Sequence, residues 1–265
     1  MKTFALLAAL ALSPACTTAA AGSFYVAGGG SGAGTASEAY DIEVDSPTFT
    51  ALSLNAEFAG SISPWVLGSN TLVGTASMTA PPATPIADLT TRSGSVILQA
   101  MEGGGAAAIY AVGALADGEE LIVSMSMGYG QESVANNSIA LGVSFSNSAT
   151  SWNSGTIDRF YWDGGDDGIA HWDGSVKVAA VPGVPTAGGR LYWRVIREGD
   201  DLLAYWSRTG DVWAPLSEAD TVVRGHTHMW IFVNHPAAAL SGLNLTSPVE
   251  VRWVRHLAHA DVYPW

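Results

Sequence analysis

The chain has 265 residues, of which 48% are hydrophobic and only 13% are charged, and its formal net charge is −13. The acidic balance argues against a nucleic-acid partner, because the chain would repel phosphate backbones, and it disfavours adsorption to anionic lipid. Thirty glycines and ten tryptophans with so few charges favour an all-β protein with many turns. Cys16 is the only cysteine, so an intrachain disulfide is excluded.

The first 22 residues have the pattern of a cleavable secretory signal peptide. Lys2 is followed by an apolar run over residues 4–12 and then by small residues up to Ala21. The run is too short to cross a bilayer, and we predict no membrane span elsewhere in the chain. This interpretation predicts a secreted or periplasmic protein.

Residues 10–37 support a second interpretation. The segment LALSPACTTAAAGSFYVAGGGSGAGTAS resembles a short segment at the start of phage tail-fibre and related virion proteins. That resemblance implies an adaptor that docks onto other virion proteins, with the chain as a homo-oligomer in the virion. Both interpretations stay open from the sequence. In either case we expect residues 1–44 to be an anchor, linker or signal segment, and residues 45–265 to be one domain.

Short segments of alternating character follow one another through the rest of the chain. Aliphatic and aromatic residues alternate with small or polar ones, which is the period of strands with one buried face. Glycine and proline turn signals separate these segments at a spacing typical of a sandwich, and no helical period occurs after residue 13. We expect strands at residues 95–101, 107–112, 121–127, 138–146, 159–162, 169–172, 175–181, 226–234 and 249–257.

Residues 191–216, LYWRVIREGDDLLAYWSRTGDVWAPL, form the most distinctive segment. The pattern predicts three short strands joined by turns at Gly199 and Gly210. The segment resembles the late hairpin of concanavalin A-like (lectin or laminin-G type) β-sandwiches. The resemblance implies an antiparallel jelly-roll β-sandwich and predicts that Trp213 is a buried core residue.

An acidic, glycine-rich turn lies between two expected strands at residues 163–168. Asp163, Asp166 and Asp167 supply three carboxylates, which are the hard oxygen ligands that Ca²⁺ prefers. The spacing is not that of an EF-hand loop. The alternatives are a calcium site and a solvated turn.

Aromatic residues flank this acidic turn and suggest a glycan site. Sugar rings stack on indole faces, and neighbouring polar groups bind sugar hydroxyls, so we predict a glycan cradle formed by Tyr161, Trp162, His171, Trp172 and Asp173. The alternative is that both indoles are core residues at strand ends. Tyr161 and Trp162 are adjacent, so one of them must face outward.

Sequence motifs for catalysis were not found. His226 and His228 share one face of an expected strand as a zinc pair would, but a third ligand is not evident and a surface or hydrogen-bonded pair is favoured. No pair of carboxylates with glycosidase spacing, no nucleophile elbow and no phosphate-binding loop is present. We therefore expect a non-catalytic protein, and the resemblance of residues 10–37 implies a component of a phage particle (tail fibre, tail tip or head decoration) that binds host surface glycan. The alternative is an exported bacterial carbohydrate-binding protein.

Overall fold

The computed structural model describes residues 49–51, 53–77, 82–101, 105–127, 140–155, 157–163, 168–182, 190–216, 221–222, 225–234 and 248–259. The predicted anchor or signal segment over residues 1–44 therefore lies outside the described residues. Every regular element in the described ranges is a strand. No helix long and apolar enough to cross a membrane occurs in this part of the chain.

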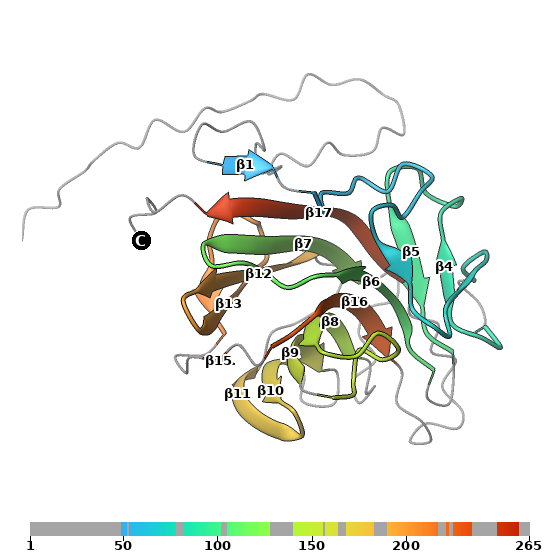
Figure 1. Cartoon of the computed structure of the whole chain (residues 1–265). Helices are drawn as coiled ribbons and strands as arrows, with labels where there is room; N and C mark the ends of the chain where they lie inside the picture. The colour runs from blue at the N-terminus through green and yellow to red at the C-terminus, as the bar shows by residue number, and fades with distance from the viewer. Residues whose placement is uncertain are drawn as a thin grey trace, which may run out of the picture. The chain divides into compact units, whose positions relative to one another are not determined.

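The described strands form two sheets that pack face to face (Figure 1). The smaller sheet has seven strands, and all its described pairings are antiparallel. Its strands, in spatial order, are β11 (Val176–Pro182), β10 (Gly168–Asp173), β9 (Ile157–Asp163), β8 (Ala140–Ser146), β16 (His228–Asn234), β6 (Ala107–Val112) and β2 (Val66–Leu67).

The larger sheet has ten described strands, and β3 with β4 is its parallel pair. The two-residue or three-residue strands β1 (Phe49–Ala51) and β15 (Thr221–Val222) pair with β17 and β13, respectively. The main path runs through β14 (Ala214–Pro215), β13 (Asp201–Ser207), β12 (Arg190–Glu198), β7 (Glu119–Met127), β17 (Val249–His259), β5 (Val96–Gln99), β4 (Ile86–Asp88) and β3 (Leu72–Val73).

The core lies between the two sheets and is built by alternation along the strands. In β8, Leu141, Val143 and Phe145 point into this core, whereas the intervening residues point outward. Each fully buried aliphatic or aromatic side chain of this kind contributes about 1.5–3 kcal/mol through removal of apolar surface from water. The expected antiparallel β-sandwich is confirmed.

Of the three strands predicted over residues 191–216, two form at full length and the third is short. β12 and β13 make the expected hairpin, but the third strand is reduced to Ala214–Pro215. Ala214 pairs with Trp206, whose side chain packs against the inner core, so the preceding Trp213 points outward. Trp213 is half-buried against Tyr192 and Trp253 on the outer face. The prediction that Trp213 is a buried core residue is therefore wrong.

Candidate functional site

The outer face of the seven-stranded sheet carries a cluster of aromatic side chains. Because inward residues of β16 and β6 fill the core, the alternate residues Trp230, Phe232 and Ala108 point away from it. Tyr161 and Ala140 are buried in the same outer cluster. Its partly buried members are Tyr110, Trp152 and Trp172. Trp230 and Phe232 are almost fully buried, so the surface of this face is formed by the partly buried rings Tyr110, Trp152 and Trp172.

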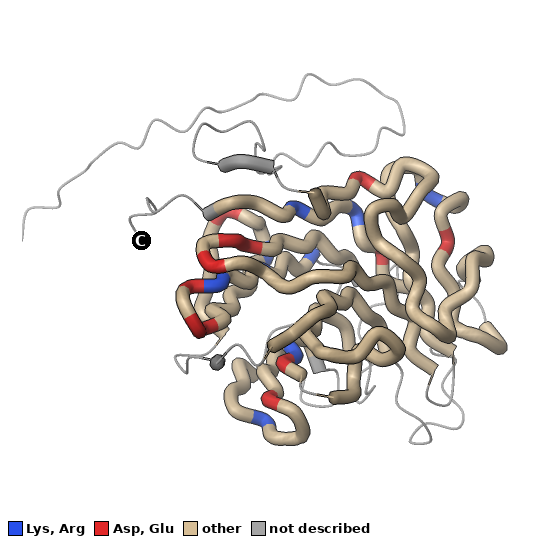
Figure 2. The backbone as a smooth tube through the Cα atoms, viewed as in Figure 1, with Lys and Arg blue, Asp and Glu red and all other residues tan. Residues whose placement is uncertain are grey.

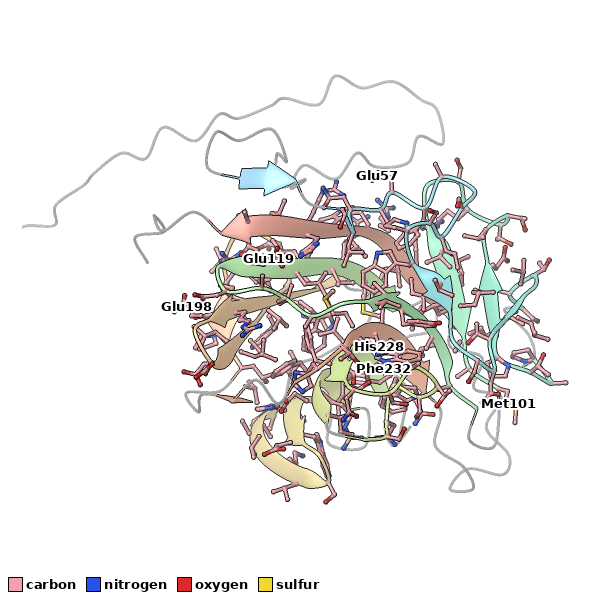
Figure 3. The ribbon with its side chains drawn as sticks, viewed as in Figure 1. Glu57, Met101, Glu119, Glu198, His228 and Phe232 are labelled. Atoms are coloured by element: carbon pink, nitrogen blue, oxygen red, sulfur yellow. The ribbon has the colours of Figure 1, made fainter. Side chains whose placement is uncertain are left out.

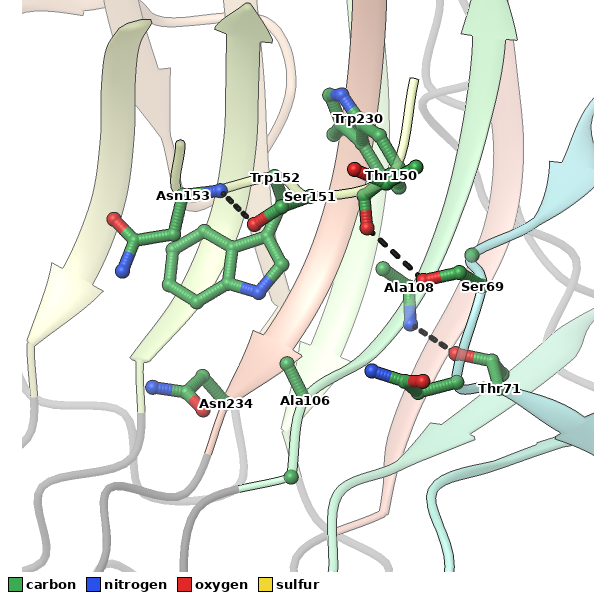
Figure 4. Close-up of a pocket in the computed structure, with 13 residues that line it drawn as sticks. Ser69, Thr71, Ala106, Ala108, Thr150, Ser151, Trp152, Asn153, Trp230 and Asn234 are labelled. Carbon is green, nitrogen blue, oxygen red and sulfur yellow. Dashed lines mark hydrogen bonds between the residues drawn. The ribbon is translucent and has the colours of Figure 1, made fainter. Parts of the chain in front are cut away.

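A pocket of about 400 Å³ lies at this outer face (Figure 4). Its volume falls in the range of small-ligand sites. None of the described residues that line it has an ionisable side chain. They are Gly68, Ser69, Asn70, Thr71, Gly105, Ala106, Ala108, Thr150, Ser151, Trp152, Asn153, Trp230 and Asn234.

One wall of the pocket comes from loop 147–155, which connects β8 and β9. The Trp152 indole stacks on the Phe232 ring with centroids 4.0 Å apart and an interplanar angle of 14°. The Ser144 hydroxyl donates to the Trp152 carbonyl oxygen at 2.8 Å, and the Asn153 amide N–H donates to the Ser151 hydroxyl at 3.1 Å. Side-chain to backbone hydrogen bonds of this kind hold a loop without regular structure.

The facing wall comes from residues 68–71, which run along β6. A Cβ at Gly68 would lie 3.0 Å from the Ala108 carbonyl oxygen, so glycine permits the close approach of this segment to the sheet. The Thr71 hydroxyl accepts from the Ala108 N–H at 3.0 Å. The Ser69 hydroxyl donates to the Thr150 carbonyl oxygen at 3.0 Å and joins the two walls.

Indoles and amides together define the chemistry of the pocket. Trp230 Nε1 donates to the Ser146 hydroxyl at 3.0 Å, which fixes that indole. Asn70, Asn153 and Asn234 bring carboxamide groups, each of which can both donate and accept. Such a pocket suits a ligand that has apolar ring faces and a rim of hydroxyl groups.

The structure brings two of the predicted glycan-site residues together. Tyr161 and Trp172 lie on the outer face with centroids 6.5 Å apart and an interplanar angle of 20°. Tyr161 also meets Phe232 edge-on at 6.1 Å, which joins this pair to the ring beneath Trp152. The predicted residues and the pocket therefore belong to one outer face.

Trp162 does not share this surface with Trp172. It is only 3% exposed and packs in the core between the sheets. Trp162 pairs with Ile169, and Trp172 pairs with Arg159, so the register places the two indoles on opposite faces of the sheet. The predicted platform of both indoles is therefore not formed, and the core interpretation holds for Trp162.

His171 also points inward, and a buried acid lies beside it. His171 Nε2 lies 3.5 Å from Asp158 Oδ1, and His226 Nε2 lies 3.0 Å from Asp158 Oδ2. Burial raises the pKa of Asp158, but the hydrogen bonds and charges of the two imidazoles outweigh it and hold this pKa below its usual range. Asp173 is half-buried at the end of β10.

The two histidines suggested as a zinc pair have different neighbours. His226 faces Asp158, whereas His228 Nδ1 is hydrogen-bonded to the Thr227 hydroxyl at 2.8 Å and the His228 ring lies 5.7 Å from the Tyr110 ring. In the described ranges no three His, Cys, Asp or Glu side chains are placed to hold a metal. Asp166, Asp167 and the Asp163 side chain lie outside what the structure describes, so the predicted calcium site is untested.

Sequence reasoning missed the pocket because its walls come from distant segments. Trp152 and Asn153 follow a serine-rich stretch, and residues 68–71 precede the proline-rich break, so neither has a local signature of a site. The alternation of residues 228–234 does place Trp230 and Phe232 on one face, and this was the available signal.

No protein-family model and no curated protein matches the sequence. Solved structures match it at the level of fold. Arcelin-5, a lectin-like defence protein from Phaseolus vulgaris, is 9% identical with a TM-score of 0.52, covering 79% of this chain and 98% of that one. The Ca²⁺-bound exoplasmic/lumenal domain of VIP36 is 10% identical with a TM-score of 0.51, covering 81% of this chain and 90% of that domain.

A third similar structure is the β-glucanase of Bacillus licheniformis, at 12% identity and a TM-score of 0.50, covering 78% of this chain and 98% of the enzyme. These likenesses confirm the concanavalin A-like sandwich that residues 191–216 suggested. They do not bear on residues 10–37, and the resemblance of that segment to phage tail-fibre proteins stays a prediction.

Proposed function

We propose that this chain is a non-catalytic carbohydrate-binding protein. Its site is the pocket between residues 68–71 and 150–153 on the outer face of the seven-stranded sheet. The observation that carries the proposal is the pairing of two indoles with three carboxamides in one pocket. The apolar face of a sugar ring would stack on Trp152, and its hydroxyl groups would bond to Asn70, Asn153 and Asn234.

Binding is favoured over hydrolysis by the charge of the pocket. The common glycoside hydrolases use two carboxyl groups that flank the scissile bond. None of the described lining residues is an aspartate or glutamate. A β-glucanase has the same fold, however, so release of reducing ends from a polysaccharide panel is part of the test.

We further propose that the protein is displayed on a phage particle as a homo-oligomer, where residues 10–37 dock on other virion proteins and the sandwich meets host surface glycan. The resemblance of that segment supports this setting. The alternative is an exported bacterial carbohydrate-binding protein with a cleaved signal. Mass spectrometry of purified particles and N-terminal sequencing of the native chain distinguish the two, because a mature start near Gly22 would contradict virion display.

We also propose that the acidic turn with Asp163, Asp166 and Asp167 binds Ca²⁺. If the turn holds Ca²⁺, calcium should raise the melting temperature of the full chain, since a ligand of the folded state stabilises it by mass action. The double variant Asp166→Asn/Asp167→Asn should lose that increase. An equal melting temperature in calcium and in EDTA would favour the solvated turn.

A glycan array followed by titration calorimetry on the full chain tests the binding site. Trp152→Ala should weaken the affinity for a bound glycan about tenfold, which is the loss expected for one aromatic contact. Trp213→Ala is the matched control, because that indole is half-buried on the outer face of the other sheet. Equal affinity in Trp152→Ala and the unsubstituted protein would refute this site, and reducing-end release would refute the non-catalytic role.

A further inference from the structure

Arg159 lies at the border between the pocket and Trp172. Its Nη1 donates to Oδ1 of Asn153, which lines the pocket, at 2.5 Å, and its Nη2 donates to the Gly174 carbonyl oxygen at 2.6 Å. The guanidinium carbon lies 5.4 Å from the Trp172 ring centroid and 5.9 Å from that of Tyr161. These four contacts hold the charge in one place on the outer face.

No described carboxylate forms an ion pair with this guanidinium, although Arg159 is only 9% exposed. Its Nε is buried without a hydrogen-bond partner. Burial lowers the pKa of Arg159, and only the nearby Tyr161 acts in the opposite direction. A buried charge without a counter-ion is costly, so buried charges in proteins are normally paired. Among the described residues, Arg159 therefore lacks a carboxylate counter-charge.

The hydrogen bond from Arg159 also orients the Asn153 carboxamide. Because a guanidinium can only donate, the atom that it contacts is the amide oxygen, and the amide nitrogen is left to donate elsewhere. In Figure 4 this nitrogen lies on the side of Asn234. A guanidinium has five N–H donors, of which Asn153 and Gly174 occupy two. The border of the pocket is therefore rich in donors.

We propose that the glycan bound in this pocket carries a sugar carboxylate, as uronic and sialic acids do, and that Arg159 pairs with it. The ligand carboxylate then pairs with Arg159, which has no ion pair with a described carboxylate. The planar guanidinium can donate to both carboxylate oxygens. A ring stacked on Trp152 would lie next to Asn153, whose carboxamide oxygen Arg159 contacts. This inference rests on the proposed function, because it names the class of glycan that the same pocket takes.

Titration calorimetry of the full chain with matched pairs of oligosaccharides tests the inference. One pair is an oligogalacturonate and its methyl ester, and the other is sialyllactose and lactose. The acidic member of one pair should bind about 10- to 100-fold more tightly than its neutral counterpart, which is the range for a hydrogen bond to a charged group. The ratio should shrink as salt is raised. The pair that shows the preference identifies the source of the carboxylate.

Two variants locate the effect at Arg159. Arg159→Gln removes the charge, and Asn153→Asp gives Arg159 a carboxylate within the protein, so both should reduce the acid-to-neutral affinity ratio to near one. Arg208→Gln is the control, since burial also lowers the pKa of Arg208 but it belongs to the ten-stranded sheet side, and it should keep the ratio. Thermal unfolding checks that each variant folds. If Arg159→Gln does not fold, the affinity ratio of Asn153→Asp tests the inference.

Three results separate the inference from the proposed function. Equal affinities within both pairs, or a glycan array with neutral ligands only, would overturn the inference and leave glycan binding in place. A preference for the acidic member that survives in both variants would also overturn it, because the carboxylate would then bind elsewhere. The absence of binding to any glycan, acidic or neutral, would overturn the proposed function and the inference with it.

Discussion

The outer faces of the two sheets differ in whether their arginines have carboxylate partners. On the ten-stranded sheet, each of three arginines has a carboxylate partner: Arg194 with Glu120 at 2.7 Å, Arg255 with Glu57 at 2.6 Å and Arg92 with Glu250 at 2.5 Å. On the seven-stranded sheet, Arg159 bonds only to neutral groups among the described residues, beside a pocket without ionisable lining. Figure 2 shows a group of acidic residues around the ends of β7, β12 and β13.

Aromatic side chains lie on both outer faces, so they do not make the difference. Trp253 lies under the Arg255 guanidinium at 4.7 Å on one sheet, as Trp172 lies under Arg159 on the other. In Figure 3, Glu198 lies at the hairpin end of β12 on the larger sheet, and Phe232 lies on β16 of the smaller one. Arg194, Arg255 and Arg92 of the ten-stranded sheet are paired with carboxylates, whereas Arg159 of the seven-stranded sheet has no ion pair among the described residues. The comparison therefore supports the proposed site on the seven-stranded sheet.

Breaking an internal ion pair should produce the largest effect. Glu120→Gln should lower the free energy of unfolding by about 3–5 kcal/mol, because the Arg194 guanidinium then stays buried without its nearest carboxylate. Urea denaturation at neutral pH measures this loss. Arg159→Gln is the comparison, since it leaves no carboxylate without a partner, and its cost should be clearly smaller. Equal costs for the two variants would contradict the contrast between the faces.

The two indoles that flank the acidic turn should respond differently to removal. Trp162→Ala should cost about 3–5 kcal/mol, as expected for a large side chain in the core. Trp172→Ala removes a half-buried ring on the outer face, so its cost should be smaller and its effect on glycan affinity larger. Denaturation and calorimetry on both variants give the comparison. Loss of binding without loss of stability in Trp162→Ala would reverse the assignment of faces.

Strand positions were predictable because alternation is a local signal. Residues 107–112 were expected as a strand and form β6 over the same range. Which of two adjacent aromatics points inward depends on pairing between strands, and this is why Trp162 was wrongly grouped with Trp172. The pocket was out of reach for a related reason. Trp152 meets residues 68–71 only because β8, β16 and β6 are neighbours in the sheet.

Asp158 should make a moderate contribution to the pH dependence of stability. It points inward from β9, whereas the neighbouring Arg159 points outward. The pKa of Asp158 is lowered in the folded state, so its contribution to stability is present above the ordinary carboxyl value of 3.8 and is lost as pH falls through the folded pKa. Asp158→Asn should abolish this part of the acid dependence. Denaturation curves from neutral pH down to pH ~2 measure it. An unchanged pH profile would show that the two histidines do not hold this carboxylate ionised.

The smallest effect should come from Trp213→Ala, on the charge-paired face. The indole is half-buried, and the Arg194 guanidinium carbon lies 5.7 Å from its ring centroid. Partial loss of apolar contact and of one cation–π contact predicts a cost of about 1–2 kcal/mol, below that of a core indole. Glycan affinity should stay unchanged, because the ten-stranded face has no part in the proposed site. A cost equal to that of Trp162→Ala would make Trp213 the structural tryptophan that the late-hairpin resemblance predicted. A loss of glycan affinity would place a binding surface on the ten-stranded sheet. It would contradict the proposal that glycan binds only on the seven-stranded sheet.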